Sequence, residues 1–158
     1  MSEAAAISGM IFLILIGAAV FNYFVETSGL PQLLVQLVEN LGLGPHGVLL
    51  VLMGFYVVLG CFMDSLSMIL LTVPFVFPVV AGLQIDAIWF GILLVTVVEL
   101  GLITPPIGMN LFTLRVVADL PLRTIVCGIV PFILADMVRL AILLAIPAIS
   151  LWLPARML

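Results

Sequence analysis

Long apolar runs separated by short polar interruptions make up this sequence. No charged residue lies between Ala4 and Val25, and an uncharged run of that length is sufficient to cross a bilayer as an α-helix. The pattern predicts a membrane span, a break at 27–31 and a short helix at 32–41. The short helix is too short and too polar to span, so we expect it to lie at the membrane interface or to be a bent continuation of the span. We therefore predict that residues 6–41 form a membrane span followed by a short interfacial helix.

The next run, 48–80, is almost wholly apolar and has one polar cluster near its middle, at 60–67. A single straight helix would place Asp64 near the centre of the bilayer, at a cost of a few kcal/mol. A pair of helices that enters and leaves the membrane on one side would instead place the cluster at its tip, where Asp64 and Ser65 cap the second helix. We therefore predict a re-entrant helical hairpin over 48–82.

A second interruption divides the following apolar segment. Pro105 and Pro106 lack backbone N–H donors, and each proline pushes the residue before it out of helical geometry. Apolar sequence nevertheless resumes after the prolines, so we predict a broken helix over 86–118, with one half ending near Leu100 and the other beginning at Pro106. A proline kink in an ordinary span is the alternative. Irregular backbone inside a membrane is tolerated where protein or a watery cavity satisfies it, and it is typical of transporter binding sites.

The last apolar run predicts one long span over 125–153. It contains Asp136 and Arg139, which lie three residues apart on one helix face and can neutralise each other. This pair is either a structural contact within the helix bundle or part of a moving interface, and the sequence leaves both readings open.

The few basic residues indicate an orientation. Arg115 and Arg123 flank the turn before the last span, and the positive-inside rule places such a turn on the cytoplasmic side. Counting spans from that turn puts Trp89 on the outer side. Tyr23 and Trp152 fall on the same side, so we expect the three rings to form one interfacial aromatic belt.

Composition narrows the class of protein. Of the 158 residues, 66% are hydrophobic and 8% are charged, and the formal net charge is −4. A soluble domain carries about 25% charged residues, so this composition favours an all-α integral membrane protein. The negative charge and the lack of a basic cluster argue against nucleic-acid binding. No catalytic metal or nucleophile motif occurs, which argues against an enzyme; a passive ion channel or a structural membrane bundle remains the alternative to a transporter.

The two interruptions together suggest a cation site. Where helices end inside a membrane, their last carbonyls are unpaired and carry a partial negative charge, and glycines at 60 and 101 let two backbones approach closely. With the Thr104 hydroxyl, these carbonyls would form an oxygen cage for sodium. Half-helices beginning after Asp64 and at Pro106 would present N–H groups to an anionic substrate. Thr104 equally suits a plain N-cap before Pro105, so residue chemistry alone leaves the ion site open.

Several strings resemble one transporter family. They are the G-x-x-x-D-S pattern at 60–65, PFVFPVV at 74–80, FGILLV at 90–95, ELGLITPPIGMNLF at 99–112 and IVPFILADMV at 129–138. Together with GAAVFNYFVETSGLPQLL at 17–34, they resemble the large membrane (M) subunit of tripartite ATP-independent periplasmic (TRAP) transporters. The resemblance covers nearly the whole chain, and the combination of G-L-I-T-P-P-x-G with the upstream G-x-x-x-D is its most specific feature.

This resemblance implies a fold and a mechanism. It implies the second half of an inverted-repeat elevator transporter in the bacterial inner membrane, driven by sodium and importing a small carboxylate. The partners implied are a small membrane (Q) subunit, a periplasmic substrate-binding protein and the missing N-terminal half of the large subunit, since the chain resembles only the C-terminal portion. Alone, it is expected to transport nothing.

The resemblance also implies a sodium site. Its ligands would be Gly60, Gly101, Thr104 and the Ile107 carbonyl. The residues expected near the ion or the substrate are Asp64, Ser65, Ser67, Glu99, Pro105, Pro106, Gly108 and Asn110. Family members usually carry asparagine two residues before the glutamate that matches Glu99, whereas this chain has Val97. That departure argues against a direct substrate contact from position 97.

Overall fold

The computed structural model describes residues 2–40, 42, 44–105 and 108–157, and all its regular structure is helical. The prediction of an all-helical protein is therefore confirmed for this part of the chain. The helices are α1 (Ser2–Thr27), α2 (Leu30–Asn40), α3 (Pro45–Gly60), α4 (Ser65–Gly82), α5 (Ala87–Ile103), α6 (Met109–Ala118), α7 (Leu122–Ala145), α8 (Pro147–Leu151) and α9 (Pro154–Met157).

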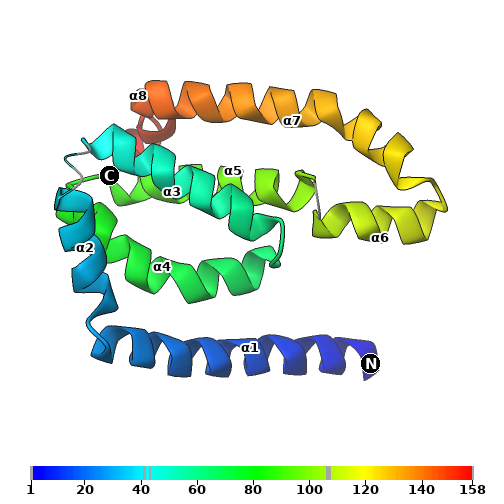
Figure 1. The fold of residues 1–158 in the computed structure, drawn as a ribbon, viewed down its shortest axis with the longest axis horizontal. Helices are drawn as coiled ribbons and strands as arrows, with labels where there is room; N and C mark the ends of the chain where they lie inside the picture. The colour runs from blue at the N-terminus through cyan, green and yellow to red at the C-terminus, as the bar shows by residue number, and fades with distance from the viewer. Residues whose placement is uncertain (1, 41, 43, 106–107, 158) are drawn as a thin grey trace.

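The helices form layers with the long α1 on one side and the long α7 on the other (Figure 1). Between them, α3 and α4 run in opposite directions, and both feet of this hairpin lie at the same end of the molecule. The hairpin tip reaches only as far as the junction of α5 with α6 (Figure 1). Among the described residues, three helical segments are long and apolar enough to cross a membrane: 4–27 in α1, α4 and α7. The shorter α3 and α5 are also apolar.

Aspartates begin two of these helices. The Asp64 carboxylate accepts a hydrogen bond from the Ser67 N–H at 2.9 Å, at the start of α4. The Asp86 carboxylate accepts from the N–H groups of Ile88 and Trp89, at 2.8 and 3.1 Å. Each satisfies donors that have no partner inside the helix. The capping role predicted for Asp64 is therefore confirmed.

The core of the molecule lies where α3, α4 and α5 pack together. Its fully buried side chains include Leu49, Met68, Leu93 and Val97. The Tyr56 hydroxyl, also fully buried, lies 2.8 Å from the Thr72 hydroxyl and links α3 to α4. Val97, the position at which this sequence departs from the family pattern, is thus a packing residue of this core.

A side chain of α1 satisfies a carbonyl that a proline leaves unpaired. Pro74 lies inside α4 and has no N–H to donate to the carbonyl of Leu70, four residues earlier. The Asn22 side-chain amide donates to that carbonyl at 3.1 Å. In a membrane no water replaces a lost backbone donor, so this hydrogen bond both completes α4 and holds α1 against it.

The same arrangement occurs at the end of α7. Pro147 ends the helix and leaves the Leu143 carbonyl without its usual donor. The Trp89 indole N–H donates to this carbonyl at 2.9 Å. Within the predicted span over 125–153, the helix is therefore interrupted: α7 stops at Ala145 and the short α8 follows.

The predicted aromatic belt is wrong at Trp89. Its ring is 6% exposed and packs inside the protein, because its N–H serves the Leu143 carbonyl. Tyr23 and Trp152 are exposed, as a lipid-facing belt requires, and Arg156 lies 5.0 Å from the Trp152 ring centroid.

Two glycines let α3 cross α5 at backbone contact. A Cβ atom built on Gly60 would lie 2.8 Å from the Gly101 Cα, and one built on Gly101 would lie 2.9 Å from the Gly60 Cα and 3.1 Å from the Val57 carbonyl oxygen. Such distances leave no room for a side chain at either position. The crossing joins the last residue of α3 to the final turn of α5.

We predict that Gly101→Ala destabilises the chain, because the new methyl group meets backbone atoms that cannot rotate away. Overpacking of this kind costs about 1–3 kcal/mol. Gly91→Ala is the matched control, since Gly91 lies in the same helix and a Cβ there meets nothing within 4 Å. Unfolding in mixed micelles would measure both variants; equal stability of the two would contradict the close crossing.

We predict that Asn22→Leu costs about 1–3 kcal/mol, the penalty for leaving a buried carbonyl without a donor. In a Pro74→Ala background the restored N–H at position 74 can donate to Leu70, so the same substitution should cost much less. A double-mutant cycle on the free energy of unfolding measures this coupling. Additive effects of the two substitutions would show that Asn22 does not serve the proline-freed carbonyl.

Candidate functional site

The structure brings the hairpin tip and the helix break together. Gly60 at the tip contacts Gly101, and the neighbouring Cys61 thiol lies 3.6 Å from the Thr104 carbonyl oxygen and 3.3 Å from that of Val57. Three of the four predicted sodium ligands, Gly60, Gly101 and Thr104, therefore lie in one neighbourhood. The fourth, Ile107, lies outside the described residues.

The first half of the broken helix is longer than predicted. We expected it to end near Leu100, but α5 continues to Ile103, so Gly101 is a helical residue. Thr104 is the first residue to leave helical geometry, with φ −80° and ψ 126°. The reason is Pro105, whose ring excludes the helical region for the residue directly before it but not for earlier ones.

The predicted start of the second half of the broken helix, Pro106, lies outside the described residues. In the described part, α6 starts at Met109 and its N-cap is Gly108, whose backbone has the positive φ of +38°. Thr104 is therefore not the N-cap of this half-helix, and that interpretation is wrong. Gly108 is buried, and a Cβ there would lie 3.1 Å from the carbonyl oxygens of both Leu102 and Thr104.

Thr104 instead closes the end of α5. Its hydroxyl donates to the Leu100 carbonyl at 2.5 Å, and its N–H donates to the Gly101 carbonyl at 3.2 Å. A hydroxyl has one proton and two lone pairs, so a hydroxyl that donates to Leu100 still has oxygen lone pairs for another partner. The Gly101 carbonyl, which accepts one hydrogen bond here, also has a second lone pair.

The remaining predicted residues surround this neighbourhood in different ways. Asp64 is exposed and caps α4 through the Ser67 N–H, while Ser65 is half-buried in the first turn of α4. Pro105 is half-buried in the break, and Asn110 is exposed in the first turn of α6. Pro106 lies outside the described residues.

Glu99 has a partner that the sequence analysis did not identify. Its carboxylate lies 3.4 Å from the Arg139 guanidinium, which also lies 3.2 Å from the Asp136 carboxylate. The predicted pair of Asp136 with Arg139 is thus confirmed, and the arginine additionally links α7 to α5. The Glu99 side chain is 61% exposed. The sequence limits the possible partners to four basic residues but does not select Arg139 among them.

The chemistry of this neighbourhood is that of oxygen ligands. No group of three or more His, Cys, Asp or Glu side chains that could hold a metal ion occurs in the described part of the chain. What Gly60, Gly101 and Thr104 offer is backbone carbonyl oxygens and one hydroxyl. Such oxygens at half-helix ends are the groups that coordinate sodium in transporters with broken helices.

The chain was compared with known protein families and curated proteins. Residues 1–149 match the family described as "Tripartite ATP-independent periplasmic transporter, DctM component". The C4-dicarboxylate TRAP transporter large permease protein DctM of Pseudomonas aeruginosa is 37% identical over 152 residues, which are 96% of this chain and 36% of that protein. The sialic acid TRAP transporter large permease protein SiaM of Vibrio cholerae is 31% identical over 154 residues, which are 98% of this chain and 36% of that protein.

A third relative joins two transporter components in its name. The isethionate TRAP transporter permease protein DctMQ of Oleidesulfovibrio alaskensis is 28% identical over 95% of this chain and 24% of its own length. The chain thus spans about a third of the curated large permeases that it matches. The family match and the apolar helices together confirm a multi-pass integral membrane protein, and the chain belongs to the DctM family of tripartite ATP-independent periplasmic transporters.

Proposed function

We propose that this chain is the sodium-binding second half of a TRAP large permease that imports organic acids. The coupling ion would be bound by oxygens of Gly60, Gly101 and Thr104, with the Ile107 carbonyl as the fourth ligand. The observation that carries the proposal is the backbone contact of Gly60 with Gly101. It holds the end of α3 against the end of α5, so the carbonyl ends of two helices converge, and their dipoles favour a cation.

The state of Thr104 supports this assignment. The Thr104 hydroxyl donates to the Leu100 carbonyl and keeps its lone pairs for an acceptor role. A small cation bound by those lone pairs would favour this arrangement, because its charge repels the hydroxyl proton and leaves it pointing at Leu100.

The arrangement of the helices supports a re-entrant hairpin. Both feet of the α3–α4 hairpin lie at one end of the molecule and its tip ends beside the helix break, whereas α1 and α7 extend further (Figure 1). With α1 and α7 as full spans, the tip would lie inside the membrane. The turn with Arg115 and Arg123 would be cytoplasmic by the positive-inside rule, so the feet would be periplasmic and the hairpin would open outward, in the bacterial inner membrane.

The complete transporter would need partners. We propose that the remaining part of the large subunit supplies the other half of the transport site, and that a small membrane (Q) subunit and a periplasmic substrate-binding protein complete the assembly. The names of the three relatives give their substrates as C4-dicarboxylates, sialic acid and isethionate. These are all organic anions, so we propose an organic acid as the substrate class of an elevator-type carrier.

We predict that sodium stabilises the purified chain in detergent more than potassium does at equal ionic strength. A ligand at ten times its Kd stabilises by about 1.4 kcal/mol. Thr104→Val should abolish the difference between the two cations, because it removes a ligand oxygen. Thermal unfolding in matched sodium and potassium buffers measures it.

Thr96→Val is the control for this experiment. The Thr96 hydroxyl donates to the Ile92 carbonyl at 2.8 Å, four residues earlier in the same helix, which is the same intrahelical bond that Thr104 makes. Both variants should therefore lose similar stability in potassium, and only Thr96→Val should keep the sodium effect. A sodium effect that survives Thr104→Val would remove this residue from the ligand set.

We predict that vesicles containing only this polypeptide show no sodium-driven uptake of organic acids, even with a periplasmic binding protein added. The chain provides one of the two halves that the elevator mechanism requires. Uptake of a labelled dicarboxylate under an inward sodium gradient measures this, with a complete large permease and its small subunit as the positive control. Clear uptake by the chain alone would refute the half-site proposal, whereas sodium stabilisation without uptake would agree with it.

A further inference from the structure

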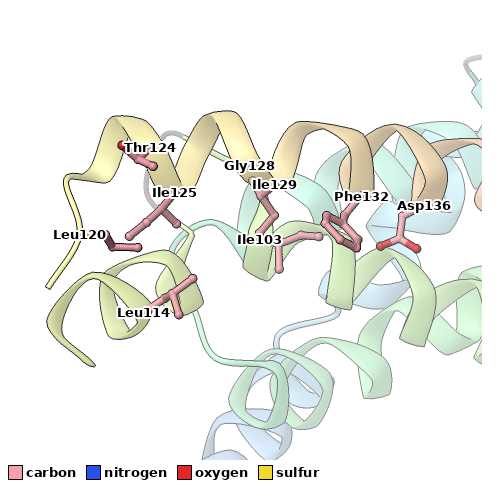
Figure 2. A pocket seen from close by; sticks show the side chains of 9 residues that line it. All are labelled: Ile103, Leu114, Leu120, Thr124, Ile125, Gly128, Ile129, Phe132 and Asp136. Carbon is pink, nitrogen blue, oxygen red and sulfur yellow. The ribbon is translucent and has the colours of Figure 1, made fainter. Parts of the chain in front are cut away.

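An apolar pocket lies between α6 and α7 on the side of the break away from the hairpin (Figure 2). Its volume is about 490 Å³, and six of its nine lining residues have aliphatic or aromatic side chains. Ile103 lies at its floor, and Gly128 leaves a gap in its wall, since a Cβ there would meet nothing within 4 Å. The volume falls in the range of about 300–1,000 Å³ that is typical of small-molecule sites.

One end of the pocket lies at the turn between α6 and α7. Leu114, Leu120 and Thr124 line this end (Figure 2). Each is next to a charged residue in the sequence: Arg115 follows Leu114, Asp119 precedes Leu120 and Arg123 precedes Thr124. Both arginines are exposed. The ion pairs of the described residues all involve Arg139, so neither arginine has a carboxylate partner there. With Asp119 between them in the sequence, the turn at this end of the pocket carries one net positive charge.

The other end of the pocket is electrically balanced. Asp136 lines it, but its carboxylate lies 3.2 Å from the Arg139 guanidinium and its side chain is only 26% exposed. The outer surface of the neighbouring α6 is apolar, with Val116 and Val117 about four-fifths exposed. If this surface faces hydrocarbon in the assembled protein, the pocket is a cleft in a lipid-facing wall, next to a positively charged turn.

We propose that this pocket binds one anionic phospholipid, with an acyl chain between α6 and α7 and the phosphate against Arg115 and Arg123. Charge complementarity selects this occupant. Anionic lipids are found in the cytoplasmic leaflet, and basic clefts between membrane helices on that side bind their headgroups. A neutral apolar molecule would use the cleft but would gain nothing from the arginines. The site goes beyond the proposed ion binding, since it shares no ligand with it.

The test measures lipid retained by the purified chain. The chain is reconstituted in nanodiscs with equal amounts of phosphatidylglycerol and phosphatidylethanolamine, transferred to mild detergent and analysed by native mass spectrometry. One net charge near the membrane surface is worth a preference of roughly fivefold. We therefore expect one retained phospholipid per chain, with phosphatidylglycerol favoured by roughly that factor.

Two sets of variants separate the pocket from the headgroup site. Gly128→Leu fills the cleft without a backbone clash and should abolish retention, whereas Gly54→Leu, at an open helical position outside the pocket, should not. Arg115→Gln combined with Arg123→Gln should keep a retained lipid but remove the preference for phosphatidylglycerol. Sodium stabilisation of the chain should be unchanged in all of them, which distinguishes a failure of this site from a failure of the ion site.

Three outcomes would overturn the proposal. Equal retention by Gly128→Leu and Gly54→Leu would show that the lipid lies elsewhere on the apolar surface. A retained lipid with the headgroup composition of the nanodisc would show that the arginines do not select it. If the unsubstituted chain retains no lipid, the cleft does not bind a phospholipid, and another protein segment is expected to cover it.

Discussion

The backbone contact between Gly60 and Gly101 is the interaction on which the rest of this structure depends. It lets α3 approach α5 until no Cβ fits between them, and this approach places the hairpin tip beside the helix break. The packing of α3, α4 and α5 continues outward from the same crossing through the buried core. A larger residue at either glycine would move the hairpin tip away from the helix break. The oxygens that we propose as sodium ligands would then no longer lie together.

A second constraint is the supply of backbone hydrogen bonds in an apolar medium. Pro74 and Pro147 each remove a donor, and in each case a side chain from another helix donates to the freed carbonyl: Asn22 to Leu70 and Trp89 to Leu143. In water such carbonyls would be solvated, but in hydrocarbon they need a protein partner. These prolines therefore create attachment points, and they join α1 to the hairpin and α7 to α5.

Much of the fold follows from the sequence because apolar length and proline position act locally. The two interruptions, the caps at Asp64 and Asp86 and the pairing of Asp136 with Arg139 all depend on residues a few positions apart. The predicted end of the first half-helix at Leu100 was three residues too early, because α5 continues through Gly101 to Ile103. A glycine inside an apolar helix costs only about 1 kcal/mol, which helix packing at the crossing readily offsets, so the helix continues until Pro105 forbids it.

The features that sequence reasoning missed depend on contacts between distant segments. Trp89 suited an interfacial belt by its position, and only the tertiary structure shows that its N–H serves a carbonyl 54 residues away. Glu99 and Arg139 are 40 residues apart, and nothing in the local sequence selects Arg139 over Arg115 or Arg123 as the partner. In the candidate site, the glycines and Thr104 could be singled out from the sequence as possible oxygen ligands, but the cap geometry of Thr104 required coordinates.

The two halves of the broken helix are held very differently. α5 is attached to α3 by the glycine crossing, and to α7 by the Trp89 hydrogen bond and by the ion pair of Glu99 with Arg139. α6 packs on α7 beside an open cleft, and its N-cap Gly108 has a positive φ. Gly101 and Thr104, which we propose as sodium ligands, therefore lie at the end of the half-helix that is anchored both to the hairpin and to α7.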